Sequence, residues 1–460
     1  MSRIAKTALS VLGLFVASLL PSPVSAQVVT LEEVLNLASN SMLVTIADAE
    51  IERAEWRERE AGALRFPRIR VQSTLSPAPR VELDDPNDPL SNRQSDRELL
   101  ESLIGGAGLS FRAELRVTVP LTTFGQIRLA RRLAAAGAEL VEVQREAAID
   151  QSRFEAYRAY VGLQVFEVVE DLFSEASGRL ARAEELLEDQ IDDGDFSART
   201  SLRQLTISRA SFTQRRTETE ASGRLARFAL LRLLQLPVDF ETTPLVEDVT
   251  LGEPPSLDDV IAAAIEQRPD LIALRQGVDA RRLAALVRWR ALAPTAGLTV
   301  QMGGAYSPTV DDVSGPFIYD PWNRFGLGFG VGLSWNMNPL QITRRARRAD
   351  AEVAIIEAQL EGAVQAVSLD IAEAYWDSTG KLEAFHAQSE AYSAARAWLN
   401  QRWFQFDQGL ADFDDVKDPL EAYYRVAGEY YAALTELRMA VANLALQCGD
   451  DDFASWPTVP

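Results

Sequence analysis

Residues 325–337 read FGLGFGVGLSWNM, and large apolar side chains alternate here with glycine, serine or asparagine. Successive side chains of a β-strand point to opposite faces of its sheet, so this segment is predicted to form a strand with one apolar and one almost bare face. A soluble sheet with one buried face is the commoner origin of such alternation. However, the segment has the length of a tilted strand that crosses a membrane. The bare second face and the length together favour a membrane strand.

Three more segments alternate in the same way, near residues 66–76, 109–120 and 296–306. Aromatic residues gather near the strand ends and loops, as in an interfacial girdle. An open sheet edge in lipid leaves backbone groups unpaired, so other copies of the chain must complete the sheet. Two, three or four copies would give eight, twelve or sixteen strands. The charged side chains on the polar faces, which we expect to line the barrel lumen, are Arg68, Arg70, Arg112, Glu114 and Arg116.

The chain contains one unit twice. Residues 30–34 (TLEEV) match residues 256–260 (SLDDV), and each match predicts a helix start, because a hydroxyl side chain precedes acidic residues of the first turn. Each of these helices is expected to continue to a proline, Pro67 or Pro294. The duplication predicts a first repeat at 27–236, a linker at the equator at 237–255, a second repeat at 256–447 and a C-terminal tail at 448–460.

Two very long helices are predicted, one in each repeat. No proline interrupts residues 126–190 or 342–406, which are rich in Ala, Leu, Glu and Arg. At 1.5 Å per residue such a helix is roughly 97 Å long. No globular core is that wide, so we expect the helices to pack along one another as coiled coils. Shorter helices run back after turns at Gly194 and Gly409.

Composition excludes several classes of function. Asp and Glu total 67 against 46 Lys and Arg, a formal charge of −21, which argues against nucleic acid as a partner. The single cysteine, Cys448, and the single histidine, His386, leave no disulfide framework and no Cys/His zinc cluster. We therefore predict neither catalytic residues, nor a cofactor, nor a metal site.

Residues 1–26 are expected to be a signal peptide. Arg3 and Lys6 form a basic start, residues 8–20 form an apolar run, and Val24-Ser25-Ala26 fits a cleavage site. The apolar run is shorter than the roughly 20 residues that span a bilayer. The sequence thus predicts export from the cytoplasm.

The order and spacing of these motifs resemble the TolC-like outer-membrane efflux protein family over essentially the whole mature chain. The residues that carry the resemblance are the two helix starts, Val119-Pro120-Leu121 with Phe124-Gly125, and the turns at Gly194-Asp195-Phe196 and Gly409-Leu410-Ala411. The resemblance implies a mainly α fold with a membrane β-barrel portion: long coiled-coil helices form an α-barrel, and four strands per chain contribute to a trimeric twelve-stranded β-barrel. It also implies a passive conduit in the bacterial outer membrane that extends into the periplasm.

The resemblance also implies partners and sites. Such proteins serve efflux or type I secretion with a periplasmic adaptor and an inner-membrane transporter of RND, ABC or MFS type. The family narrows at a ring of aspartates, and the matching positions are Asp415 and Asp418. Residues three apart share a helix face, so three chains would place two stacked carboxylate rings around one axis. Expected contacts of the tips with the adaptor are Gly194, Asp195, Gly409 and Leu410.

Some positions depart from the family pattern. Thr200 is the first-half counterpart of Asp415, and Phe406 and Ala411 replace the family's tyrosine and arginine. The charged latch is therefore not reproduced, and Arg199 is predicted to pair instead with an aspartate of the second tip, Asp414. The lumen arginines either favour anionic cargo or pair with Glu114.

A second hypothesis is a soluble periplasmic coiled-coil adaptor or scaffold. This class of protein would explain the long helices. It would not explain four alternating strands with polar or glycine-lined second faces.

Overall fold

The computed structural model describes residues 27–80, 101, 108–195, 197–234, 236, 240–247, 249, 251–312, 319–335 and 338–457. The expected signal peptide lies outside these residues. The chain divides into two compact units. The strand unit comprises Glu50–Val141 and Leu274–Leu360, and the helical unit comprises residues up to Ala49, Glu142–Ala273 and residues from Glu361 onward.

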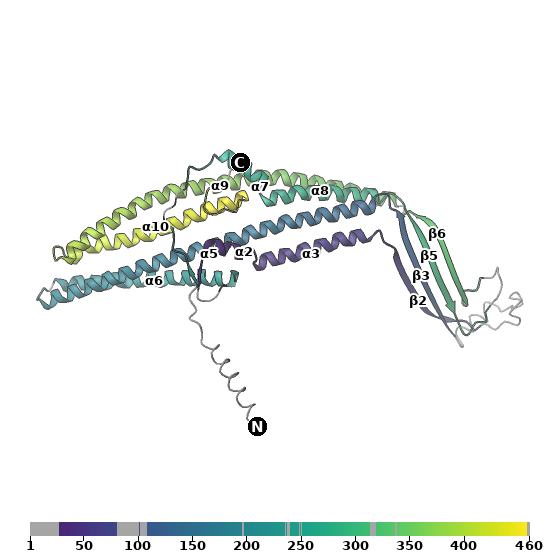
Figure 1. Cartoon of the computed structure of the whole chain (residues 1–460), viewed down its shortest axis with the longest axis horizontal. Coiled ribbons are helices and arrows are strands. Elements are labelled where there is room, and N and C mark those ends of the chain that lie inside the picture. Colours follow the sequence, from purple (N-terminus) through teal and green to yellow (C-terminus); the bar gives the residue numbers. More distant parts are fainter. Residues whose placement is uncertain are drawn as a thin grey trace, which may run out of the picture. The chain divides into compact units, whose positions relative to one another are not determined.

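The strand unit contains a four-stranded antiparallel sheet of order β2-β3-β5-β6 (Figure 1). A mainly helical chain with this four-stranded sheet confirms the mainly α fold class with a β portion that the sequence predicted. Among the described residues, the outer edges of β2 and β6 have no strand partner. The strands are β2 (Arg68–Ala78), β3 (Gly108–Thr122), β5 (Thr295–Tyr306) and β6 (Arg324–Ser334).

The register places apolar side chains in continuous rows across the sheet. One such row consists of Ile69, Val117, Val300 and Phe329. A shift of one residue along each strand gives a row on the other face, made of Arg70, Arg116, Gln301 and Gly328. The two faces predicted from the alternation are therefore confirmed.

Helices of the strand unit begin or end at one end of the sheet (Figure 1). α5 (Gln126–Asp192) begins just after Phe124 and Gly125, whose φ angles of 47° and 88° turn the chain out of β3. The Gln126 side-chain amide donates to the carbonyl oxygens of Arg290 and Ala293 at 2.8 and 3.1 Å. These bonds join the start of α5 to the end of α8 (Pro269–Arg290).

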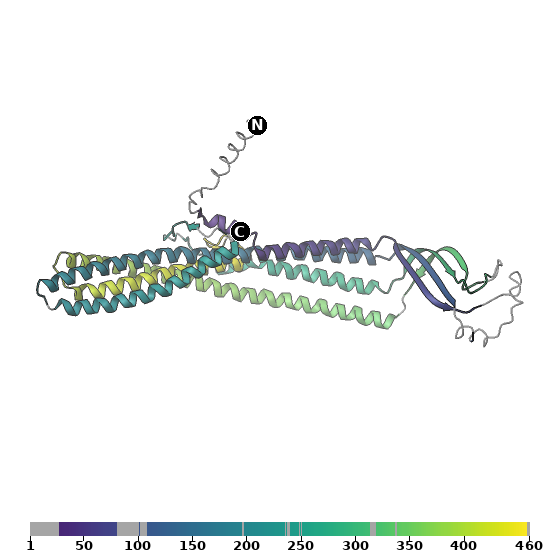
Figure 2. The same cartoon turned by 90° about the horizontal axis from the view of Figure 1, so that it is seen from below.

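Ion pairs connect the helices of the strand unit. Arg282 of α8 lies 2.7 Å from Glu357 of α9 (Pro339–Asp407), and the two helices run side by side (Figure 2). Trp289 Nε1 donates to Asp350 at 3.1 Å. Such exposed contacts each contribute little free energy.

The helical unit begins with a short parallel pairing of β1 (Gln27–Val29) with β4 (Phe240–Thr242). Thr30 Oγ1 accepts a 3.2 Å hydrogen bond from Glu33 N, and Ser256 Oγ accepts one of 3.3 Å from Asp259 N. The two predicted helix starts are thus confirmed as N-caps. The remaining elements of the unit are α2 (Leu31–Ala38), α6 (Ala198–Leu234), α7 (Leu257–Gln267) and α10 (Phe413–Cys448), with parts of α3 (Met42–Ala63), α5, α8 and α9.

Both helices expected to run from these caps to a proline are interrupted. The first ends at Ala38 and resumes as α3 at Met42, and the second stops at Gln267 before α8. In the second case Pro269 has no N–H to donate, and it forces the preceding Arg268 into extended backbone with ψ of 122°. The expectation of single helices was wrong at both points.

Two helical hairpins, α5–α6 and α9–α10, pack together through one apolar core. Leu187, Leu205, Leu399 and Leu420, one from each helix, are at most 1% exposed within it. Cys448, at the end of α10, is buried too, and this burial raises the pKa of its thiol to about 12. The thiol is therefore a neutral core group.

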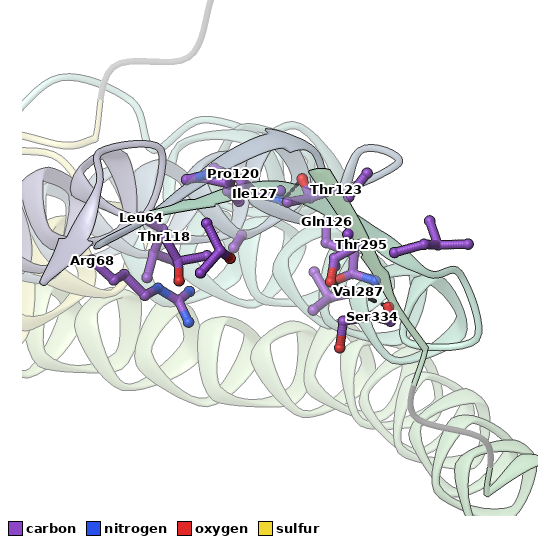
Figure 3. A pocket seen from close by; sticks show the side chains of 16 residues that line it. Leu64, Arg68, Thr118, Pro120, Thr123, Gln126, Ile127, Val287, Thr295 and Ser334 are labelled. Atoms are coloured by element: carbon purple, nitrogen blue, oxygen red, sulfur yellow. Dashed lines mark hydrogen bonds between the residues drawn. The ribbon is translucent and has the colours of Figure 1, made fainter. Parts of the chain in front are cut away.

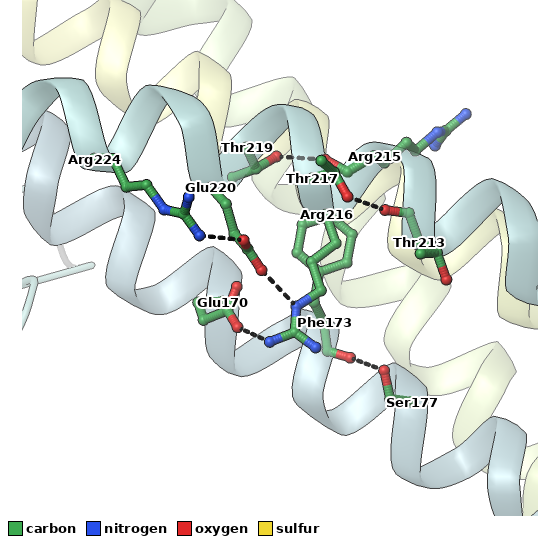
Figure 4. Close-up of polar contacts among 10 residues, drawn as sticks. All are labelled: Glu170, Phe173, Ser177, Thr213, Arg215, Arg216, Thr217, Thr219, Glu220 and Arg224. Atoms are coloured by element: carbon green, nitrogen blue, oxygen red, sulfur yellow. Dashed lines mark hydrogen bonds and ion pairs between the residues drawn. The ribbon is translucent and has the colours of Figure 1, made fainter.

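Charged side chains align the two helices of the first hairpin (Figure 4). Arg216 of α6 pairs with Glu170 of α5, and its Nε lies 3.3 Å from Glu220. Glu220 also accepts from Arg224 at 3.1 Å. These residues form a row of alternating charges that links α5 to α6.

Residues of the expected linker pack on the helices of the helical unit. Tyr431 of α10 donates its hydroxyl to Glu247 at 2.7 Å. Leu245 and Leu251 lie against the aromatic core that contains Tyr430 and Tyr431.

Candidate functional site

The two hairpin tips have the same backbone geometry. Gly409 N donates to Phe406 O at 2.9 Å, and Leu410 N donates to Gln405 O at 2.8 Å. Gly194 and the residue after it repeat this pair of bonds at 3.1 and 2.9 Å. Both glycines have positive φ, 68° at Gly409 and 100° at Gly194, as this type of helix ending requires. The duplicated sequence thus forms two equivalent turns.

Gly409→Ala is expected to lower the stability of the tip, because a Cβ in the left-handed region costs about 1–2 kcal/mol. The midpoint of thermal unfolding in detergent measures this change. The control is Gly362→Ala within α9, where a new Cβ meets no atom within 4 Å and alanine favours the helix. Equal shifts for the two variants would contradict the assignment of strain to the turn.

The acidic residues of the second tip begin α10. Asp412 N donates to Asp415 Oδ2 at 3.3 Å, so the Asp415 carboxylate helps to cap its own helix. Negative charge in the first turn of a helix is also favoured by the helix dipole. A local structural role of Asp415 is therefore present in the single chain.

Asp415 and Asp418 both lie on the exposed face of α10. The opposite face is buried, since Phe413, Val416 and Leu420 are at most 1% exposed. This placement leaves both carboxylates available to an assembly of chains. Their arrangement as rings stays a prediction.

A cavity of about 360 Å³ lies beside Asp418, between α6 and α10. Ser208 donates to Glu421 at 2.8 Å in its wall. Arg215 and Arg425 also line it, so the cavity carries both signs of charge.

Pro419 has no N–H, so the Asp415 carbonyl lacks the usual helical partner at this point.

The first tip holds Asp195 and Arg199. Asp195 Oδ1 accepts hydrogen bonds from Ser197 N and Oγ at 2.8 and 2.7 Å, and these bonds lower the pKa of the Asp195 carboxyl. Its contribution to stability is present above the ordinary carboxyl pKa and is lost as the pH falls through the lowered value. Asp414 is exposed, and its pairing with Arg199 stays a prediction.

Sequence reasoning missed the contacts that join the two hairpins behind the tips. Arg182 Nε of α5 lies 3.8 Å from Asp407 Oδ1 of α9, and the Arg179 guanidinium stacks 5.3 Å from the ring centre of Trp403. These partners are far apart in sequence, so no local pattern indicates them. They connect α5 to α9 near the two tips.

The five charged residues predicted for a lumen do share one face of the sheet. Arg116 lies 2.6 Å from Glu114, its neighbour two residues away. Sequence reasoning missed a sixth member, Arg324, which joins Arg112 in one row through Ala305. The signal was present, because Arg324 continues the alternation of β6 by one residue.

The described residues contain neither a metal-binding cluster nor a membrane-spanning helix. Among these residues, no cluster of three or more His, Cys, Asp or Glu side chains is placed to hold a metal ion. None of the helices described here is long and apolar enough to cross a membrane.

No family model and no curated protein matches the sequence. Solved structures do match. CusC, studied for transmembrane channel formation, is 14% identical, with a TM-score of 0.71 over 91% of this chain and 92% of that one. The CmeC outer membrane channel of Campylobacter jejuni is 15% identical, with a TM-score of 0.69 over 91% and 85%.

The open MtrE outer membrane channel of Neisseria gonorrhoeae gives the same result: 18% identity and a TM-score of 0.68 over 92% of this chain and 89% of that one. The matches cover nearly all of each chain, including both repeats. Therefore the chain has the fold of the TolC-like outer-membrane channels, as its motifs predicted.

Proposed function

We propose that this chain is the outer-membrane channel of a tripartite efflux or type I secretion system, a homotrimeric passive conduit from the periplasm to the exterior. One observation carries the proposal. One face of the sheet is largely apolar, and in the described part of the chain its side chains on β2 and β6 are exposed, with Phe329 84% exposed. Lipid of the outer membrane is the environment that such a face fits.

The unpaired sheet edges explain why the conduit must be an oligomer. An unsatisfied backbone N–H or C=O in hydrocarbon costs several kcal/mol. Pairing β6 of one chain with β2 of the next satisfies both edges. Three chains then close a twelve-stranded barrel, and the glycines of β6 keep its interior open.

The helix tips are the proposed periplasmic end. Asp415 and Asp418 form the constriction there, and Arg199 pairs with Asp414 in the closed state. Gly194, Asp195, Gly409 and Leu410 contact the periplasmic adaptor, which links the conduit to an inner-membrane transporter. Leu410 is 77% exposed, and an apolar side chain at a tip suits contact with another protein.

The soluble scaffold hypothesis leaves the apolar face in water. Ile69, Val71, Leu327, Phe329 and Val331 are each at least 67% exposed. Exposure of apolar surface costs about 25 cal/mol per Å². A soluble protein would bury these side chains, so the sheet favours the channel.

Cell fractionation separates the two functions. We expect the full chain to sediment with the outer membrane, to require detergent for extraction, and to yield a trimer on chemical cross-linking. Alkaline washing, which strips peripheral proteins, is the control and is expected to release none of it. Recovery with the soluble periplasmic contents would contradict the channel and favour the scaffold.

A further inference from the structure

The charged residues of the four strands are strongly biased in sign. They comprise five arginines and one glutamate, a net charge of +4, in a chain whose overall charge is −21. All six lie on the polar face of the sheet. The arginine face, as we name it, consists of Arg68, Arg70, Arg112, Arg116 and Arg324, with Glu114 among them.

Two arginines of this face lie directly opposite each other. Arg70 of β2 pairs in register with Arg116 of β3, and like charges in such cross-strand positions are destabilising. Glu114 lies 2.6 Å from Arg116 and neutralises that one member of the pair. Local arrangements that oppose stability are candidates for a functional role.

The other arginines of this face lie in two more rows of the sheet. Arg112 and Arg324 share a row through Ala305, and Arg112 donates to the carbonyl of Pro321 at 3.2 Å. Arg68 lies in register with Thr118, and Figure 3 shows its side chain among the residues that line a pocket of about 590 Å³ at the helix end of the sheet. Positive groups therefore occur in the β2–β3 pair from the row of Arg68 and Thr118 to the row of Thr74 and Arg112.

The neighbouring strand in the proposed trimer adds no negative charge. β2 would pair with β6 of the next chain, whose polar face presents glycines, Ser334 and Arg324. Within the described parts of the chain, Arg68 and Arg70 form no ion pair. The glycines also leave room, since a Cβ built at Gly326 or Gly328 meets no atom within 4 Å. A cavity of about 770 Å³ lies over this face, and its charged lining residues are Arg112, Arg324 and Glu114, two positive groups against one negative group.

We infer that the arginine face is an oxyanion-binding surface inside the conduit, and that the cargo includes molecules with phosphate, sulfate or carboxylate groups. This inference rests on the proposed channel function. A guanidinium presents paired N–H donors that match two oxygens of such a group. The open glycine strand beside it accommodates the rest of the molecule. The carboxylates of the gate have the opposite charge, so variants separate the two sites.

The test is block of single-channel current in a planar bilayer by inorganic tripolyphosphate, added to each side in turn at low salt. We expect concentration-dependent block of the wild-type protein. Arg70→Gln/Arg116→Gln is expected to raise the blocking concentration about tenfold or more, because it removes two charge-assisted contacts. Arg112→Gln/Arg324→Gln, in the other row, is expected to act in the same direction and covers the case in which the first variant does not fold.

The control is Arg57→Gln/Arg132→Gln, which removes the same charge from exposed helix positions of the strand unit. It is expected to leave the block unchanged. An equal effect in the control, or a conducting wild type that tripolyphosphate does not block, would overturn the arginine face as an anion site and leave the channel intact. A correctly folded trimer that conducts no current, both as wild type and after Arg199→Ala removes the proposed closed-state pair, would instead overturn the channel function itself.

Discussion

Asp415→Asn/Asp418→Asn is expected to abolish the cation preference of the channel. In the proposed trimer the two residues supply six carboxylates around one axis, and such rings attract cations and exclude anions. The measurement is the reversal potential of single channels in a salt gradient. We expect it to move from the sign of a cation-selective channel to zero or to the opposite sign. The same carboxylate rings are the expected site of block by multivalent cations. We therefore expect the double variant to lose this block as well.

Asparagine is preferred to alanine for this test because of the structure. Asp415 accepts the hydrogen bond from Asp412 N that caps α10, and an amide oxygen retains it. The Asn variant therefore removes charge while it keeps the helix start, whereas Asp415→Ala removes both.

The matched control for the gate is Asp192→Asn/Asp193→Asn, two exposed carboxylates at the other tip. It removes the same charge outside the expected rings, so selectivity should persist. A channel whose selectivity is unaffected by the Asp415 and Asp418 changes would keep the conduit and reject these residues as its constriction.

Phe329→Arg is expected to prevent insertion into the outer membrane. Phe329 lies in the apolar row with Val300 and is 84% exposed in the single chain. An arginine on the lipid face of a strand costs about 2–4 kcal/mol at the middle of the bilayer, and three chains incur this cost in one barrel. The yield of cross-linked trimer in the outer-membrane fraction measures it.

Gly330→Arg provides the matched control one residue away. It adds the same charge to the same strand but on the polar face, where a new Cβ meets no atom within 4 Å. We expect this variant to assemble with nearly wild-type yield. If both variants assemble with wild-type yield, the apolar face does not contact lipid. If both lose most of the trimer, β6 tolerates no added charge on either face.

Local rules account for the parts of the fold that could be predicted from the sequence. The two faces of each strand of the four-stranded sheet follow from a side-chain period of two, which is interrupted at the register shift between Pro120 and Thr122. The N-caps at Thr30 and Ser256 depend on residues within three positions, and the turns at Gly194 and Gly409 depend on backbone that glycine adopts without strain. The shared face of Asp415 and Asp418 at the start of α10 could also be predicted, because residues three apart lie on one side of a helix.

The remaining features depend on partners that are distant in the sequence. The strand register places Arg70 opposite Arg116. It also places Arg112 and Arg324 in one row, with Ala305 between them. A register different by one residue would place these groups on the opposite face. Alternation therefore assigned each charge to a face, whereas the pairing of strands brought the arginines together. In the same way, packing of the hairpins brought Arg182 to Asp407, because contacts between helices depend on their alignment and not on local pattern.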